Sequence, residues 1–513
     1  MDGPSQRFPA TGENHALLDN VHPSGWVNPE PATFYNLVVI GAGTAGLVCA
    51  AGAASLGAKV ALIERHLLGG DCLNYGCVPS KGIIRCARAV SDARRGAEFG
   101  FSCGERAEAD FASAMARMRR IRAGLSTNDS ARRFRDELGV DLFFGTGTFT
   151  GADTIVVEGK SLRFKRAAIC TGARAAPPPF PGIKEAGYLT NETVFSQTSL
   201  PRRLAVIGSG PIGCELAQAF ARLGSQVTIL ERGSHILPRE ERDAADIVKS
   251  AFIRDGVRLA LETKTVSVAR KGDEKVISAE HGGKGIEIAV DEILVGVGRT
   301  PNMDGLGLEA AGIASDPQQG VKVDELLRTS NPRVYAAGDI CFPYKFTHTA
   351  DALARIVIAN ALFMGRQKSS ALVVPWCTYT DPELASIGMN EKRARAAGVE
   401  YDLWVEEFKD NDRSLAEGEQ VGRIKMLLDK KGKPIGVQIL GPRAGDLLSE
   451  WVAALNGGVK PMTLAAAVHP YPTLGEINKK VAGTYLSSKI FSERVKKGLR
   501  FFFHLRGRAC GPT

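Results

Sequence analysis

Two cysteines with a spacing suited to redox chemistry, Cys72 and Cys77, lie in the segment Gly69–Lys81, which reads GGDCLNYGCVPSK. Zinc is a poor interpretation, because no second Cys/His pair follows at the spacing of a zinc finger. Closely spaced cysteines beside a strand–helix–strand unit indicate a redox-active disulfide, and a thiol at the start of a helix has a lowered pKa. The spacing alone leaves open two buried cysteines of no consequence. We therefore expect a dithiol site and no resident metal.

The element that must position this segment is a strand–turn–helix–strand unit that occurs twice. An apolar run from Phe34 to Ile40 enters GAGTAG at Gly41–Gly46, and an Ala-rich helix and a strand ending at Glu64 follow. The pattern returns later in the chain as GSGPIG at Gly208–Gly213, with a strand ending at Glu231. The acid lies at the same distance beyond the third glycine in both copies.

This spacing is typical of dinucleotide binding. The first glycine allows the tight turn, the second lets the backbone approach a pyrophosphate, and the third packs helix on strand. The helix N-terminus attracts the phosphates, and the terminal acid accepts ribose hydroxyl groups. Two glycine-rich turns without ligands are the alternative. Two dinucleotides on one chain indicate electron transfer.

Composition narrows the class of protein. The chain has 513 residues, 44% hydrophobic and 24% charged, which is ordinary for a globular protein of several domains. Ten cysteines are too sparse for a secreted disulfide framework, and residues 1–34 do not resemble a signal peptide, so we expect a cytoplasmic protein. The net charge is +9, but residues 489–508 hold seven Lys/Arg against Glu493, so the basicity belongs to a tail and does not indicate nucleic-acid binding.

Taken in order, GAGTAG, GGDCLNYGCVPSK, GSGPIG, VGRTPN and AAGDI resemble the class I pyridine nucleotide-disulfide oxidoreductases over about residues 35–485. That family includes dihydrolipoyl dehydrogenase, glutathione reductase and mercuric reductase. The resemblance implies an α/β fold with two Rossmann-type domains, one for FAD and one for NAD(P), and a C-terminal α+β dimerisation domain of a homodimer.

The expected domains follow from this organisation. They are a flexible lead-in (1–34), an FAD domain (35–190 and 303–373), an NAD(P) domain (191–302), a dimerisation domain (374–486) and a basic amphipathic tail (487–513).

The resemblance also implies roles for single residues. Cys72 would attack the substrate, and Cys77 would lie against the flavin as the charge-transfer thiolate. Lys81 would lie near the flavin, paired with Glu215, and a helix beginning near Thr349 would point its N-terminus at the flavin. The residues expected around FAD are Gly41, Gly43, Gly46, Glu64, Lys81, Gly147, Thr171, Gly172 and Asp339, and those around the nicotinamide nucleotide are Gly208, Gly210, Gly213, Glu231 and Gly298. Glu231 favours NADH over NADPH, because a 2′-phosphate would meet a like charge, although Arg232 could compensate.

The C-terminal motif separates the branches of the family. Disulfide reductases carry a His-Pro-Thr motif whose His acts as an acid and base, whereas this chain has YPTLGE, with Tyr471 at that position and Glu476 in place. A phenol with a pKa of about 10 is a poor base at neutral pH. Mercuric reductases are similar to this chain at that point, and their second tyrosine matches Tyr188. We therefore expect a mercuric reductase-like enzyme that passes two electrons to a small-molecule or metal-ion acceptor.

Several observations leave alternatives open. Mercuric reductases carry a C-terminal cysteine pair, and this chain has only Cys510 there. His469, two residues before Tyr471, is the candidate base of a dihydrolipoyl dehydrogenase-like reductase. The tail forms a helical stripe of Phe491, Val495, Leu499 and Phe502 among basic residues, which predicts contact with an anionic membrane or packing on the protein's own dimer. A membrane-associated redox sensor with little turnover is the third alternative.

Overall fold

The computed structural model describes residues 8–102 and 107–505. The chain divides into two compact units, which are described separately. The first unit comprises Met1–Leu237 and Phe252–Leu372, and the second comprises Pro238–Ala251 and Val373–Thr513. The second unit therefore includes a short segment that the sequence places in the NAD(P) domain.

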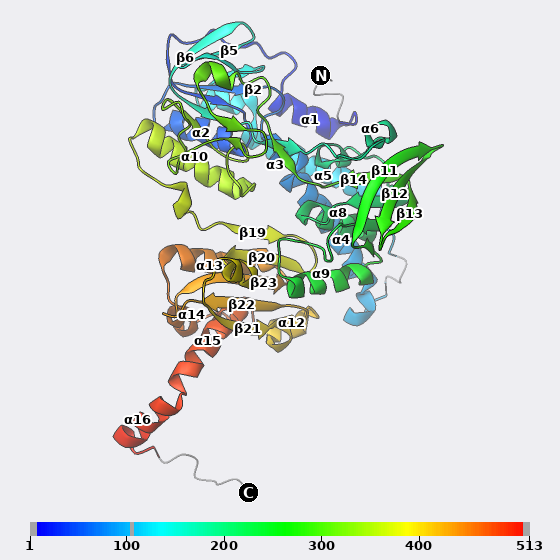
Figure 1. Ribbon diagram of the computed structural model, residues 1–513, viewed down its shortest axis with the longest axis vertical. Helices are drawn as coiled ribbons and strands as arrows, with labels where there is room; N and C mark the ends of the chain where they lie inside the picture. Colours follow the sequence, from blue (N-terminus) through cyan, green and yellow to red (C-terminus); the bar gives the residue numbers. More distant parts are fainter. Residues whose placement is uncertain (1–7, 103–106, 506–513) are drawn as a thin grey trace. The chain divides into compact units, whose positions relative to one another are not determined.

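The first sheet of unit 1 contains the two strands that flank the first glycine turn and its helix, and Figure 1 labels three of its strands, β2, β5 and β6. Its path runs β3-β2-β1-β6-β5-β4, with β18 also paired to β6, and β1, β2, β3, β6 and β18 pair in parallel. Every residue of β2 is buried, as expected for a parallel strand covered on both faces. The strands are β1 (Tyr35–Ile40), β2 (Val60–Glu64), β3 (Asp141–Phe144), β4 (Thr148–Gly151), β5 (Thr154–Val157), β6 (Lys160–Ile169) and β18 (Val334–Ala336).

Two helices pack together in this half of unit 1. They are α2 (Thr44–Ser55), which follows the glycine turn, and α10 (Thr347–Leu362). The helix expected near Thr349 begins slightly earlier, at Thr347.

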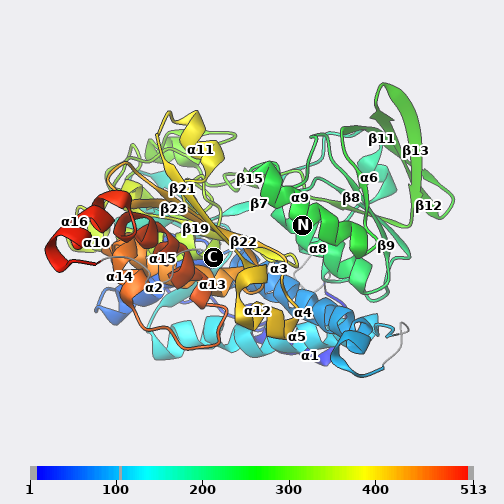
Figure 2. The same cartoon turned by 90° about the horizontal axis from the view of Figure 1, so that it is seen from below.

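The second glycine turn forms a similar layer within the same unit. Its parallel sheet has the order β10-β9-β8-β14, and a three-stranded antiparallel sheet, β11-β12-β13, accompanies it. Helix α6 (Ile183–Ala186) lies against β11 in both views (Figures 1 and 2). The elements are β8 (Arg203–Ile207), α8 (Pro211–Arg222), β9 (Gln226–Leu230), β10 (Arg258–Ala260), β11 (Thr263–Lys271), β12 (Glu274–His281), β13 (Lys284–Val290) and β14 (Glu292–Val295). The prediction of two Rossmann-type layers is confirmed.

The second unit is α+β, as predicted. Its antiparallel sheet has the order β19-β20-β23-β22-β21. Trp451 is fully buried in its core and donates a hydrogen bond from Nε1 to Asn478 Oδ1 (2.9 Å). The elements are α9 (Arg242–Arg254), divided between the units, β19 (Pro375–Thr378), β20 (Glu383–Gly388), β21 (Asp402–Glu407), β22 (Arg423–Leu428), β23 (Pro434–Gly441), α13 (Ala444–Gly457), α14 (Pro461–Ala466) and α15 (Glu476–Ile490).

The N-terminal segment differs from the expectation of a flexible lead-in. Residues Gly12–Val21 form helix α1, whose N-terminus is capped by Thr11. Leu17 and Val21 are fully buried, and α1 packs beside α5 (Phe111–Ser126) (Figure 2). The expectation is wrong for this helix, because its short apolar face of Leu17 and Val21 joins the core. Residues 1–7 lie outside the described part.

Most of the described part of the C-terminal tail is helical. After α15, residues Glu493–Phe503 form α16, and none of these described residues is buried. No helix in the described ranges is both long and apolar enough to cross a bilayer. The remainder of the predicted tail, including Cys510, lies outside the described residues.

Candidate active site

The cysteine segment forms two successive helices after β2. Cys72 lies in α3 (Gly70–Tyr75), and Cys77 is the first residue of α4 (Cys77–Arg94). Gly70 has a φ of +54°, and a Cβ built on it would lie 2.6 Å from Gly43 Cα. The cysteine helices are therefore packed tightly on the first glycine turn, at a place where a side chain does not fit.

The two thiols lie in unequal environments. Cys77 is exposed, and its Sγ lies 3.3 Å from Thr347 Oγ1. Hydrogen bonding from Cys72, then Thr347 and the positive charge of Lys81, outweigh desolvation and lower the pKa of Cys77 to about 6. The same hydrogen bond, together with burial, raises the pKa of Cys72. Both cysteines are free in the structure, and the opposite directions of these two pKa shifts favour a Cys77 thiolate beside a protonated Cys72.

The predicted pairing of Lys81 with Glu215 is present. Lys81 lies one turn after Cys77 in α4, and its Nζ lies 2.8 Å from Glu215 Oε2 on α8. Glu215 is buried, with 6% of its surface exposed. This ion pair joins the cysteine helix to the helix that follows the second glycine turn, and it holds the Lys81 ammonium close to the thiolate.

A second charged group lies beside Cys72 and was not predicted. Arg299 forms ion pairs with Asp71, which precedes Cys72 (3.1 Å), and with Asp339 (3.6 Å). Asn191 Nδ2 also donates to Asp71 Oδ1 (2.8 Å). Asp71 within the cysteine motif and Arg299 within VGRTPN were visible in the sequence, but nothing local indicated that they meet.

A pocket lies at the end of the first sheet. Four residues expected around FAD line it, namely Gly41, Glu64, Gly147 and Thr171. A Cβ on Gly41 would lie 2.5 Å from Cys170 O, and one on Gly46 would lie 1.8 Å from Gly41 O, so neither position accepts a side chain. Burial raises the pKa of Glu64, although the backbone N–H groups of Ala42 and His66 donate to it.

Gly43 and Gly172, also expected around FAD, lie next to pocket residues in the chain, and Asp339 follows a strand of the same sheet. Gly43 precedes α2 and has no side chain to cap the helix, which leaves the first N–H groups available to a phosphate. Gly172 follows Thr171 with a φ of +67°, and Asp339 lies after β18. A narrow glycine turn, an acid and a helix N-terminus fit the pyrophosphate and ribose of a dinucleotide.

The second glycine turn has the same backbone geometry. A Cβ on Gly208 would lie 2.6 Å from Gly296 O, and one on Gly213 would lie 2.2 Å from Gly208 O. Gly210 precedes α8 as Gly43 precedes α2, and Gly298, which has a φ of +129°, leads into β15 (Arg299–Pro301).

The acid of the second turn differs from that of the first. Glu231 accepts hydrogen bonds from Ser209 Oγ (2.6 Å) and Gly233 N (2.7 Å). Burial alone would raise its pKa, but these hydrogen bonds lower it. Glu231 is therefore a carboxylate at neutral pH, which fits ribose hydroxyl groups better than a phosphate.

The two predicted tyrosines lie in different units. Tyr188 is half-buried in unit 1, packed against the core of the second Rossmann layer. Tyr471, in unit 2, is 70% exposed, and its hydroxyl donates to Asp412 Oδ2 (2.9 Å). This hydrogen bond and the charge of Asp412 raise the pKa of Tyr471. Tyr471 is thus a phenol at neutral pH and cannot act as a base there.

A histidine–carboxylate pair lies close to Tyr471 in the chain. His469 Nε2 lies 2.9 Å from Glu450 Oε1, and Asn478 donates to the other oxygen of Glu450 (2.8 Å). The predicted acid Glu476 instead accepts a hydrogen bond from Thr473 N (3.3 Å). Glu450 was not predicted, because it lies on helix α13, before α14, and no motif joins it to His469. Within the described ranges, no group of three or more His, Cys, Asp or Glu side chains is arranged to hold a metal ion.

Comparison with known proteins agrees with this geometry. Residues 35–354 match the family model of the pyridine nucleotide-disulphide oxidoreductases, and residues 374–482 match the model of their dimerisation domain. The chain is 32% identical to a mercuric reductase of Lysinibacillus sphaericus over 452 residues, which cover 88% of this chain and 82% of that protein. It is 34% identical to a dihydrolipoyl dehydrogenase of Thermus scotoductus over 451 residues, which cover 86% and 95%.

Solved structures give a similar result. The HOCl-induced flavoprotein disulfide reductase RclA of Escherichia coli superimposes with a TM-score of 0.78 at 27% identity, covering 88% of this chain and 99% of that one. Mercuric reductases and dihydrolipoyl dehydrogenases are thus about equally similar to this chain, and identity does not separate the two activities.

Proposed function

Because the chain belongs to the pyridine nucleotide-disulfide oxidoreductases, we propose that it oxidises a reduced nicotinamide nucleotide and delivers two electrons to an acceptor through Cys72 and Cys77. FAD and a pyridine nucleotide are the cofactors expected of this family, and the dimerisation domain supports a homodimer. We place the enzyme in the reducing cytoplasm, with no nucleic-acid partner.

We assign the cofactors to the two glycine turns. The pocket of Gly41, Glu64, Gly147 and Thr171 would hold FAD, within a domain of residues 35–190 and 303–373. The turn from Gly208 to Gly213 would hold the nucleotide, within residues 191–302, and residues 374–486 would form the dimer. The carboxylate of Glu231 supports NADH as the preferred donor. Bound FAD would supply the two-electron exchange between the nicotinamide and the cysteine pair.

The unequal cysteine pair is the observation that carries the proposal. Cys77, with its lowered pKa, is the thiol held as the anion by Thr347 and Lys81. Cys72 keeps its proton and can receive the acceptor once that proton is removed. Cys77 is the more exposed of the two sulfurs, so in this proposal bound FAD would cover Cys77, and Cys72 would be left to meet the substrate.

We propose a soft metal ion, Hg(II), as the acceptor to test first. Thiolates are ligands for soft metals, and when the bound ion is reduced to the element the sulfurs that held it stay on the protein, so no thiolate leaves from a substrate and none has to be protonated. A phenolic Tyr471, with its pKa raised by Asp412, is compatible with such an acceptor, because no strong base is required there. In this proposal Tyr188 and Tyr471 contact the ion, and Glu476 orders the loop that bears Tyr471.

The second candidate is a disulfide reductase of the dihydrolipoyl dehydrogenase type. The observation that favours it is the contact between His469 and Glu450, because a carboxylate holds an imidazole in one orientation. His469 would then supply the proton that a leaving thiolate needs, in place of Tyr471.

An anaerobic titration with NADH, followed by one acceptor at a time, separates the two candidates. Reoxidation of the flavin by Hg(II), with metal reduction, supports the first. Reoxidation by lipoamide that is lost in His469→Gln supports the second, and Tyr471→Phe should leave it unchanged. A flavin that NADH does not reduce would contradict both candidates.

A further inference from the structure

Helix α16 is amphipathic and exposed. Figure 1 shows α15 and α16 following one another at the C-terminal end of unit 2. None of the described residues of α16, Glu493–Phe503, is buried, and the side chains of Phe501, Phe502 and Phe503 are 77%, 74% and 69% exposed. Large aromatic side chains exposed in succession are unusual on a protein surface and indicate a binding region.

Helical geometry sorts these side chains onto two faces. At 100° per residue, Val495, Leu499 and Phe502 share one face, continued by Phe491 just before the helix. Lys497 and Arg500 lie on the opposite face, and Arg494 and Lys496 lie at the two boundaries. The helix carries four basic residues against one acid, Glu493.

We propose that α16 binds the surface of a bilayer that contains anionic lipids, lying in the plane of the interface. The apolar face would enter the boundary between headgroups and acyl chains, and the flanking Arg494 and Lys496 would reach the lipid phosphates. At eleven residues the helix is too short to span the hydrocarbon core, which needs about 20.

Two observations favour a bilayer over a protein surface. Successive side chains of the helix point in directions 100° apart, and this applies to Phe501, Phe502 and Phe503. A flat protein surface that covers Phe502 would therefore leave the other two partly uncovered. A lipid interface surrounds the flanks of the helix as well. The positive charge at both boundaries complements anionic headgroups. The helix also follows residue 482, where the match to the dimerisation domain ends.

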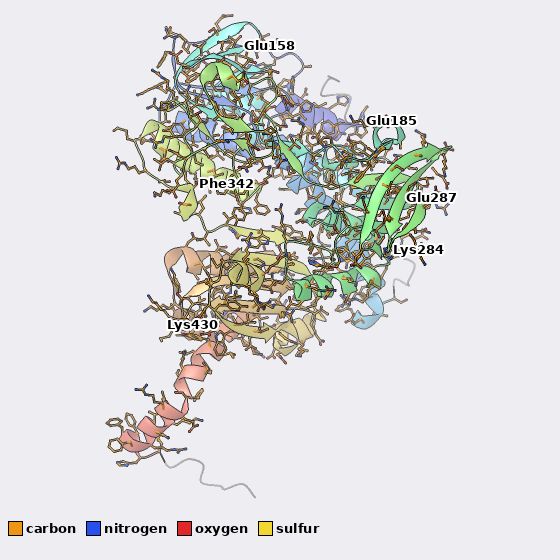
Figure 3. The ribbon with its side chains drawn as sticks, viewed as in Figure 1. Glu158, Glu185, Lys284, Glu287, Phe342 and Lys430 are labelled. Carbon is orange, nitrogen blue, oxygen red and sulfur yellow. The ribbon has the colours of Figure 1, made fainter. Side chains whose placement is uncertain are left out.

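The test is flotation of the full-length protein with vesicles of phosphatidylcholine alone and with vesicles of phosphatidylcholine mixed with phosphatidylglycerol. We expect binding only to the anionic vesicles and at least tenfold weaker binding at about 0.5 M than at about 0.1 M salt. Arg494→Glu/Lys496→Glu should lower the partition constant at least tenfold, because both flanking charges are reversed, and so should Phe502→Ser. Lys264→Glu/Lys284→Glu is the matched control for the charge reversal, on the three-stranded antiparallel sheet where Figure 3 labels Lys284. Phe363→Ser, at an exposed phenylalanine, is the matched control for Phe502→Ser. These controls should bind as the unaltered protein does.

Three outcomes would overturn the proposal. They are no binding to anionic vesicles, equal binding to neutral vesicles, and binding that neither tail variant weakens. If the tail variants instead weaken the dimer in sedimentation and vesicles are not bound, the face packs on a second copy. NADH oxidation should be unchanged in every variant, which separates this test from that of the catalytic proposal.

Discussion

The two glycine turns of unit 1 have nearly the same backbone geometry but unlike surroundings. At the first turn, Gly70 presses on Gly43, and Glu64 is buried with a raised pKa. At the second turn, Glu231 is half-buried with a lowered pKa, and no closely spaced pair of cysteines follows it in the chain. An enclosed turn suits a cofactor that stays bound, whereas an exposed turn suits one that must leave after each cycle. The same glycine pattern can therefore bind a permanent cofactor or an exchanging one, depending on how deeply the surrounding residues bury the turn.

The largest effect should come from placing a methyl group in each turn. In Gly46→Ala the new Cβ would lie 1.8 Å from Gly41 O, so we expect the purified protein to lose at least nine-tenths of its flavin absorbance. In Gly213→Ala, where the distance to Gly208 O is 2.2 Å, we expect full flavin content and a KM for NADH raised at least tenfold, about 1.4 kcal/mol.

Gly124→Ala is the matched control, because a Cβ at this position in α5 meets no described atom within 4 Å. It should retain flavin and KM. Equal flavin loss in Gly46→Ala and Gly213→Ala would contradict the assignment of separate cofactors.

The next effect concerns the cysteine pair, which only the first turn carries. Cys77→Ser should remove any long-wavelength charge-transfer band while FAD remains bound, and Cys72→Ser should retain the band. The pKa of Cys77 is lowered to about 6, so the thiolate and the band should be present above that pH and disappear as the pH falls through it. An absorbance titration from pH 8 to pH 5 measures this midpoint.

Removing the positive charge beside Cys77 tests what lowers the pKa measured in this absorbance titration. Lys81 lowers the pKa of Cys77, so Lys81→Met should move the midpoint to higher pH. Lys59→Met, which removes a surface lysine paired with Asp141, should not move it. A band that persists in Cys77→Ser would refute the assignment of the thiolate to Cys77.

How much of this site can be predicted from the sequence depends on how far apart two contacting residues lie along the chain. The glycines of each turn and the acid that follows them lie close together in the chain, so their spacing predicts both the βαβ units and the positions of Glu64 and Glu231. Thr347 is far from Cys77 in the chain, as Arg299 is from Asp71, and only folding brings them together. Helix α1 was missed because its inner face offers few apolar residues, and its order depends on the core that they join.

Nucleotide specificity should depend on Glu231 and on the neighbouring Arg232. Replacing the Glu231 carboxylate by Glu231→Ser removes the charge that disfavours a 2′-phosphate, so we expect kcat/KM for NADPH relative to NADH to rise about tenfold. Arg232→Ala should change this ratio in the opposite direction. Steady-state kinetics with NADPH and NADH measures this ratio. A ratio that is unchanged in both variants would show that residues other than Glu231 and Arg232 determine the nucleotide preference.

The smallest effect should come from helix α1, which packs with the elements around the first glycine turn and not with those around the second. Arg122 is fully buried, donates to Asn14 Oδ1 on α1 (2.8 Å), and donates to Asn74 O on the cysteine helix α3 (2.9 Å). Asn14→Ala leaves one guanidinium N–H group without this partner, so we expect the free energy of unfolding to fall by about 1–2 kcal/mol. Urea denaturation followed by fluorescence measures the change. The control Asp19→Ala, on the exposed side of α1, should alter the free energy of unfolding by less than about 0.5 kcal/mol.

Because Arg122 also holds α3, the destabilisation in Asn14→Ala should be accompanied by faster alkylation of Cys72. A variant that is destabilised without faster alkylation would show that α1 supports the core but not the dithiol.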